Sequence, residues 1–160
     1  MNAQKKERPD EYWMKEALLL AEKAESMGDV PVGAVIIKDQ EIIGHGFNSR
    51  ESGHSAIAHA EVLAIQNACN LLKTWRLIGC SVFVTLEPCL MCAGAIYQAR
   101  IQRVVFGAFD PKAGALGSLY KIHEDGRLNH RFMVKGGVLE SNCSAILQKF
   151  FKSRRDQMER

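Results

Sequence analysis

Apolar residues recur along the chain with two spacings, one that suits helices and one that suits strands. Rows of apolar residues at helical spacing, with helix-start residues before them, predict helices over residues 10–26, 59–73, 88–98 and from 141 onward. Short runs rich in Val, Ile and Phe predict strands at residues 32–38, 41–47, 81–86, 103–107 and 132–135. Because strands and helices are mixed along the sequence, the predicted fold class is α/β.

The middle of the chain predicts how two strands pair. The strand at 81–86, the helix at 88–98 and the strand at 103–107 follow one another closely. Such a unit is a right-handed crossover with parallel strands. A two-residue turn at 39–40 predicts that the first two strands form a hairpin. The length of 160 residues predicts one domain, spanning residues 1–160.

Certain side chains predict where the helices begin and end. Asp10 is predicted to cap the first helix and Gly28 to end it. Pro88 is predicted as the first residue of the third helix, where a missing N–H costs nothing, and Ser141 as the cap of the last helix. The apolar stripe of the second helix is predicted at Val62, Ile65, Cys69 and Leu72.

Composition adds that the protein is an ordinary globular one, with 47% hydrophobic and 24% charged residues. Five cysteines without a secretion signal argue against a disulfide framework, so Cys69, Cys80 and Cys143 are expected in the core. The polar start, Met1–Glu7, and the lack of any long apolar run predict a cytoplasmic protein without a membrane partner. The net charge of +3 permits a polyanionic partner without requiring one.

Candidate metal chemistry gathers at three residues. Cys89 and Cys92 have the i, i+3 spacing that places two thiols on one face of a helical turn, and His59 adds a third residue that zinc accepts as a ligand. Three protein ligands with an open fourth position are typical of catalytic zinc, whereas structural zinc fills all four. Glu61 can reach the same site only if the N-terminus of its helix points there end-on. The alternative is a structural zinc clip or a pair of core cysteines.

Other segments have residues that suit ligand contacts. Asn48 follows the second strand, where an amide can read a base edge or a ribose hydroxyl, or simply belong to a turn. The Gly- and Ala-rich segment 108–118 follows the C-terminal end of a strand, where α/β sheets bind ligands, although an ordinary surface loop has similar composition. The residues after Ser141 include five cations and two anions, which fits either a solvated helix end or a phosphate-contacting patch.

These residues together resemble a known family. His59-Ala60-Glu61 followed by Pro88-Cys89-Leu90-Met91-Cys92 is similar to the signature of the zinc-dependent nucleobase deaminases. Segments 30–35, 46–48 and 105–114 extend the likeness to the bacterial tRNA-specific adenosine deaminases of the cytidine deaminase superfamily, over about residues 11–155.

The resemblance implies a cytidine deaminase-like three-layer fold, with a central mixed sheet of five strands flanked by helices, and a homodimer. It implies one zinc ion per subunit, held by His59, Cys89 and Cys92. It also implies conversion of adenosine to inosine at the wobble position of an arginine tRNA, so that the partner is the anticodon stem-loop. It places Asn48 on the flipped nucleotide and Asp110 near the flanking backbone or sugar.

In the expected mechanism Glu61 is the catalytic residue and not a zinc ligand. Zinc lowers the pKa of water to about 7 in a favourable site, and Glu61 takes the released proton. Glu61 then protonates N1 of adenine and the amine that leaves C6. A deaminase of free guanine, cytosine or cytidine is the first alternative, since it would share these residues. An inactive, zinc-stabilised RNA-binding subunit is the second, although it would have no need of Glu61.

Overall fold

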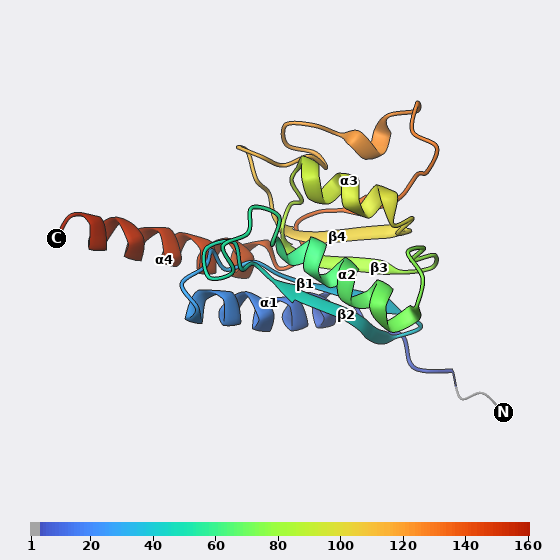
Figure 1. Ribbon diagram of the computed structural model, residues 1–160, viewed down its shortest axis with the longest axis horizontal. Helices are drawn as coiled ribbons and strands as arrows, with labels where there is room; N and C mark the ends of the chain where they lie inside the picture. Colours follow the sequence, from blue (N-terminus) through green and yellow to red (C-terminus); the bar gives the residue numbers. More distant parts are fainter. Residues whose placement is uncertain (1–3) are drawn as a thin grey trace.

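The computed structural model describes residues 4–160 and shows one sheet with helices on both faces (Figure 1). The five strands are β1 (Gly33–Lys38), β2 (Glu41–Phe47), β3 (Ser81–Leu86), β4 (Arg103–Ala108) and β5 (Met133–Lys135). The four α-helices are α1 (Asp10–Ser26), α2 (Ala60–Leu72), α3 (Leu90–Gln98) and α4 (Glu140–Met158). A short 3-10 helix covers Ile122–Glu124. Residues 1–3, part of the polar start used above, lie outside the described range.

The sheet is mixed, with the strand order β2-β1-β3-β4-β5. β1 is antiparallel to both β2 and β3, whereas β3, β4 and β5 run parallel to one another. The predicted hairpin is confirmed, and Asp39 and Gln40 both have positive φ, as a tight turn of this hand requires. The predicted parallel crossover from β3 through α3 to β4 is confirmed as well.

Side chains that alternate along the central strands form a separate core on each face of the sheet. Val82 and Val84 of β3 point to the face covered by α2 and α3, where Ile96 and Phe106 join them. Phe83 points to the other face and packs in the cluster that contains Trp13 of α1 and Cys143 of α4. The three-layer fold is therefore as predicted (Figure 1).

α2 packs its backbone closely against β2. A Cβ atom added to Gly46 would lie 2.4 Å from the Ala60 carbonyl oxygen, and one added to Gly44 would lie 2.5 Å from that of Ala64. The buried row of α2 is accordingly made of small residues, Ala60, Ala64 and Ala68. The predicted stripe of larger residues, Val62, Ile65, Cys69 and Leu72, is only half-buried, because the backbone contact with β2 leaves no room for it.

The structure corrects three predicted helix starts, the first in its capping residue and the other two in the first helical residue. Asp10 does not cap α1, because its carboxylate accepts hydrogen bonds from Arg103 instead, and Pro9 holds the cap position. α3 starts at Leu90, after Pro88, and Cys89 is its cap with an extended backbone. α4 starts at Glu140, before Ser141, because the left-handed backbone of Leu139 turns the chain into the helix. Local sequence signals located each helix but not its first turn.

The cysteine prediction is confirmed in part. All five cysteines are free thiols; Cys80 and Cys143 are buried, while Cys69 is half-buried at the edge of the core. Within residues 4–160, no helix combines the length and the apolar character needed to cross a membrane.

Candidate active site

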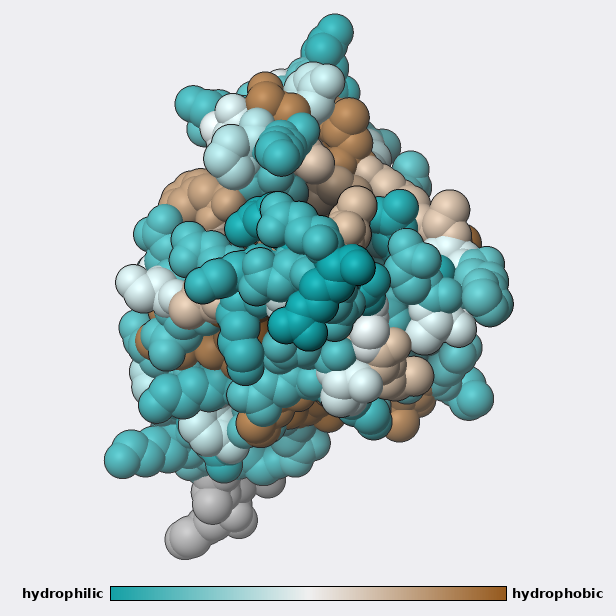
Figure 2. Space-filling view, turned by 90° about the vertical axis from the view of Figure 1, so that its left-hand side faces the viewer, coloured by the Kyte–Doolittle hydropathy of each residue, from teal (hydrophilic) through white to brown (hydrophobic). Residues whose placement is uncertain are grey.

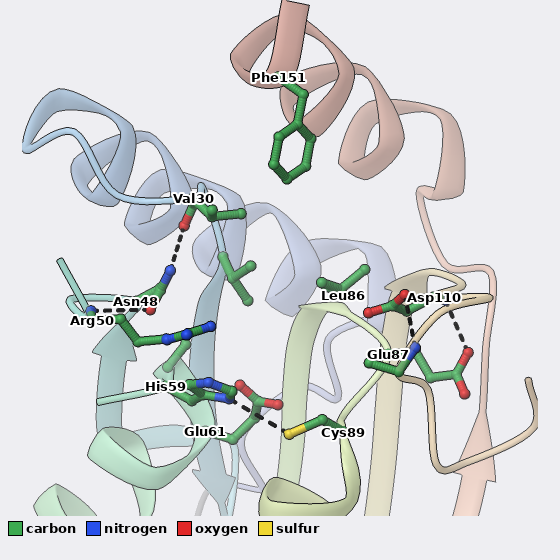
Figure 3. Close-up of a pocket in the computed structure, with 13 residues that line it drawn as sticks. Val30, Asn48, Arg50, His59, Glu61, Leu86, Glu87, Cys89, Asp110 and Phe151 are labelled. Atoms are coloured by element: carbon green, nitrogen blue, oxygen red, sulfur yellow. Dashed lines mark hydrogen bonds between the residues drawn. The ribbon is translucent and has the colours of Figure 1, made fainter. Parts of the chain in front are cut away.

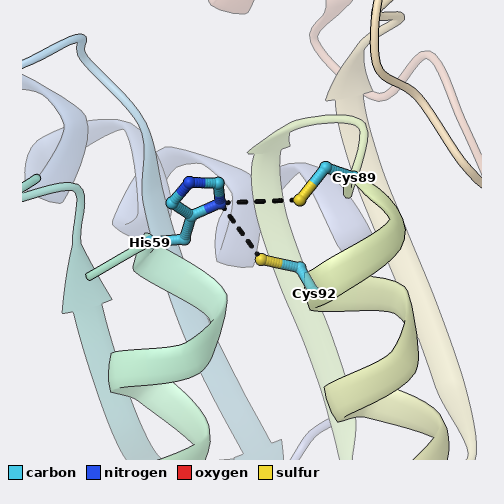
Figure 4. Close-up of side chains that lie close together, drawn as sticks. All are labelled: His59, Cys89 and Cys92. Atoms are coloured by element: carbon cyan, nitrogen blue, oxygen red, sulfur yellow. Dashed lines mark hydrogen bonds between the residues drawn. The ribbon is translucent and has the colours of Figure 1, made fainter. Parts of the chain in front are cut away.

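His59, Cys89 and Cys92 come together between the starts of α2 and α3 (Figure 4). His59 is the residue just before α2, Cys89 is the residue just before α3, and Cys92 lies in the first turn of α3. The Nδ1 atom of His59 lies 3.6 Å from Sγ of Cys89 and 3.4 Å from Sγ of Cys92. A tetrahedral zinc site with ordinary Zn–S and Zn–N lengths has S···N separations of roughly 3.6 Å, so this donor set fits zinc.

The protonation of the two thiols also suits a cation. The hydrogen bond from Cys92, together with that from His59, lowers the pKa of Cys89 to about 3. The same hydrogen bond and burial raise the pKa of Cys92, so the thiol pair shares one proton. A metal ion placed between the sulfur atoms would replace that proton, because thiolates are the form that zinc binds. The N-terminal ends of α2 and α3 add partial positive charge at the same point.

Glu61 lies beside the three ligand atoms but outside their group. It is the second residue of α2, only 4% exposed, and it lines the same pocket as His59. Burial raises the pKa of its carboxyl group. A raised pKa suits a group that must first take and then give a proton near neutral pH. The end-on arrangement that the sequence required of α2 is therefore present.

A cavity of about 270 Å³ opens above this group, close to the lower end of the range for ligand pockets. It lies where β3 and β4 end, since Leu86 and Asp110 both line it. Two residues of segment 108–118, Asp110 and Ala113, line this cavity.

Asn48 and Arg50 form one side of the pocket (Figure 3). The side-chain Nδ2 of Asn48 donates to the Val30 carbonyl at 3.1 Å, and its Oδ1 accepts from the Arg50 backbone N–H at 3.3 Å. The fully buried carboxylate of Asp29 then accepts hydrogen bonds from the backbone N–H groups of Glu51 and Ser52. These contacts hold the start of the 49–54 loop, and Arg50 extends over His59.

Asp110, Glu87 and Phe151 lie on the opposite side and at the mouth (Figure 3). Oδ1 of Asp110 accepts hydrogen bonds from the backbone N–H groups of Lys112 and Ala113, so Asp110 is a turn residue as well as a pocket residue. Its own backbone N–H donates to Glu87 at 3.1 Å. Phe151 reaches over the opening from α4 and stays 45% exposed.

All six predicted site residues lie in or against this one pocket, while several further residues were missed. Arg50, Glu87 and Phe151 line the pocket but carried no signal of their own in the sequence. Glu87 stands directly before Pro88-Cys89, and that adjacency to a ligand was the only available signal. Phe151 belongs to the helix predicted from residue 141 onward, and the structure turns its ring to the pocket.

Comparison with known proteins places this site in a class. The cytidine and deoxycytidylate deaminase zinc-binding region matches residues 7–108, more than half of the chain. The chain therefore belongs to the cytidine and deoxycytidylate deaminase family. His59, Glu61, Cys89 and Cys92 all fall within the matched residues.

Within this class, the chain is most informatively compared with three proteins. The tRNA-specific adenosine deaminase of Bacillus subtilis is 51% identical over 146 residues, 91% of each chain. A structure from studies of A-to-I editing by tRNA:A34 deaminases at the wobble position of transfer RNA has a TM-score of 0.82 and 40% identity, over 85% of this chain and 99% of that one. Guanine deaminase of Bacillus subtilis has a TM-score of 0.62 and 37% identity, over 72% and 74%.

Proposed function

We propose that this protein is a tRNA adenosine deaminase, which hydrolyses adenosine to inosine at the wobble position of the anticodon of an arginine tRNA. The observation that carries the proposal is a three-ligand metal group with a buried carboxylate, Glu61, beside it and outside it. The similarity over 91% of the chain to a tRNA-specific adenosine deaminase supports the substrate class. The residues 1–160 form one deaminase domain in this proposal.

His59, Cys89 and Cys92 hold one zinc ion per chain. Zinc, when bound, lowers the pKa of a water molecule and so makes a nucleophile available at neutral pH. Glu61 accepts the proton of that water, because its carboxylate faces the ligand group and no longer has bulk water around it. Glu61 then gives that proton to N1 of the adenine ring as the water oxygen bonds to C6. A second proton, from the hydroxyl group now on C6, passes through Glu61 to the amino nitrogen, and ammonia leaves as the C6–N bond breaks.

The pocket walls take the base and its neighbours. Asn48 contacts the flipped nucleotide, and its fixed amide orientation, set by Val30 and Arg50, makes that contact specific. Asp110 lies near the flanking backbone or sugar from the opposite wall. A target base has to leave any stack to enter such a pocket, which is easiest in a single-stranded loop such as an anticodon.

In this proposal the chain acts in the cytoplasm, because its tRNA substrate is used in translation there. It also acts as a homodimer. Large apolar side chains remain exposed at the far end of α2 and near the start of α3, and they would be covered by a second copy: Leu71, Trp75, Ile78 and Leu90. Light scattering of the purified protein measures the expected dimer mass directly, and a monomer at micromolar concentration would contradict it.

A free-base deaminase is the second candidate, and the structural likeness to guanine deaminase favours considering it. The deciding experiment incubates the protein with an arginine-tRNA anticodon stem-loop, and separately with free adenosine, guanine, cytosine and cytidine. Inosine at the wobble position without turnover of the free compounds is the expected result. Turnover of free guanine with an unchanged stem-loop would replace the proposed substrate, and no turnover in zinc-loaded protein would favour a binding-only subunit.

A further inference from the structure

Glu87 is a buried carboxylate for which the mechanism above has no use. It is 2% exposed, and none of the ion pairs within residues 4–160 includes it. Its Oε1 accepts from the backbone N–H of Asp110 at 3.1 Å and from the hydroxyl of Ser118. Its Oε2 accepts from the backbone N–H groups of Leu116 at 3.2 Å and Ser118 at 3.0 Å.

These four donors all come from the segment 110–118, which forms one wall of the pocket. The surrounding backbone adds two bonds, from Glu87 N–H to the Ala108 carbonyl and from Ala115 N–H to the Pro88 carbonyl. The fit is tight, since a Cβ atom added to Gly114 would lie 2.1 Å from Oε2 of Glu87. The segment is therefore folded around this one side chain.

The choice of a carboxylate at this position has a physical explanation. A buried charge that is met only by neutral dipoles is costly, and an apolar side chain would fill the same space without that cost. A carboxylate alone offers acceptor sites on both oxygens and no donor, which matches the four donors around it. A glutamine would place an NH₂ group against N–H groups of segment 110–118.

We infer that Glu87 is a positioning residue for substrate: it fixes the wall that contains Asp110 and Ala113 at a set distance from the metal ligand Cys89. Only Pro88 separates Glu87 from Cys89. A short stretch of backbone therefore connects the side chain that holds the wall directly to a residue of the metal group. This inference rests on the proposed function for the identity of the substrate, but its structural part does not.

The first test compares Glu87→Gln with wild type in two measurements. Hydrogen exchange followed by mass spectrometry should show faster exchange in peptides covering 108–118, with the rest of the chain and the zinc content unchanged. Steady-state kinetics on the anticodon stem-loop should show KM raised at least about tenfold and kcat lowered by less than about threefold, because Glu61 and the metal ligands stay in place.

Three further variants extend this test. Ser118→Ala removes one of the four hydrogen bonds and should give a small effect in the same direction. Gly114→Ala keeps the carboxylate but pushes the segment away from it, so it should reproduce the exchange and KM changes, even if Glu87→Gln does not fold. Asp110→Ala should make a subsequent Glu87→Gln change nearly silent in KM, whereas a purely structural role would give additive effects.

The outcomes separate the two proposals. Unchanged exchange in 108–118, or a loss of kcat with KM unaltered, would overturn the positioning role of Glu87. If wild type fails to deaminate the stem-loop, the proposed function fails, and the exchange measurement still decides whether Glu87 holds the wall.

Discussion

His59 and Glu61 are two residues apart, yet the start of α2 gives them different tasks. His59 precedes the helix, so its extended backbone turns the imidazole toward Cys89 and Cys92. Glu61 is the second residue of the helix, and its side chain lies inside the pocket, away from bulk water. The helix start thus separates the proposed metal ligand from the proposed proton carrier by one intervening residue.

Replacing Glu61 by glutamine tests this division. The variant keeps the size of the side chain but removes its ability to carry protons, so kcat should fall by about 100-fold to 10,000-fold. Zinc content, measured by inductively coupled plasma mass spectrometry, should remain at one per chain. His59→Ala is the matched control and should lose metal. A Glu61→Gln variant that also loses zinc would make Glu61 a ligand.

A second prediction at this scale concerns Asp10. The hydrogen bonds from Arg103 lower the pKa of Asp10 to about 2. Because the folded-state pKa lies below the unfolded value of about 3.9, the pairing stabilises the protein above pH 4 and is lost as pH falls through about 2. Asp10→Asn should therefore cost about 1 kcal/mol at pH 7.

Thermal unfolding between pH 2 and pH 7 checks the Asp10 prediction, with the difference from wild type shrinking toward about pH 2. Glu11→Gln, on the exposed side of the same helical turn, is the control and should shift the midpoint little. A constant difference across the whole pH range would exclude the ion pair as its cause.

The sequence was sufficient for the residues whose roles are local. The spacing of Cys89 and Cys92 predicted that their thiols lie on one face of a helical turn, and the structure places both beside His59. Arg50, Glu87 and Phe151 reach the pocket only through tertiary contacts, so no local pattern could identify them. The Arg50 backbone N–H donates to Asn48, and the next residue, Glu51, donates to the buried carboxylate of Asp29, which precedes β1. Phe151 depends on the direction that α4 takes after Leu139.

At the scale of elements, position and type were predictable but first turns and packing faces were not. The bounds of α1 and of β2 and β3 agree with prediction, because their apolar patterns are strong. The face that α2 buries was mispredicted, since hydrophobicity points to its larger residues. The glycines of β2 mark the buried face of α2 instead, because Gly44 and Gly46 leave room for the backbone of that helix.

The contact of α2 with β2 leads to a third prediction. Gly46→Ala places a methyl group against the Ala60 carbonyl, so α2 must shift, at a cost of about 1 to 3 kcal/mol. Because Ala60 follows His59 directly, zinc affinity should fall as well. Competition with a chromophoric chelator measures the affinity, and calorimetry measures the stability.

Gly94→Ala within α3 is the matched control for Gly46→Ala. No atom lies within 4 Å of a Cβ added there, so alanine should stabilise the helix by about 0.5 to 1 kcal/mol. If Gly46→Ala binds zinc as tightly as wild type, the backbone contact does not position His59.

On the scale of the whole molecule, the second half of α4 is rich in positively charged side chains. This helix projects beyond the sheet (Figure 1). The side of the molecule from which it projects carries mostly hydrophilic side chains (Figure 2). Lys149, Lys152 and Arg155 lie on the same helix as Phe151, which overhangs the pocket mouth. We expect this end to contact phosphates of the RNA on either side of the target base.

Lys152→Ala tests the phosphate contact. Binding of a labelled stem-loop should weaken, and the slope of log K against log salt concentration should fall by about one, as loss of one phosphate contact requires. Fluorescence anisotropy at several salt concentrations gives both values. Arg76→Ala, beyond the opposite end of α2 from the site, should change neither. Equal effects from the two variants would point to net charge instead of a local contact.

The placement of the metal ligands on two different helices has a consequence for the cell. A zinc ion held by His59, Cys89 and Cys92 would join the start of α2 to the start of α3, segments about 30 residues apart in the sequence, and would act as a cross-link in the folded chain. A metal ion that binds only the native state lowers the population of the open forms that proteases cleave. Zinc starvation should therefore shorten the lifetime of the protein as well as abolish its activity. The abundance of the protein in the cell would then follow the supply of zinc.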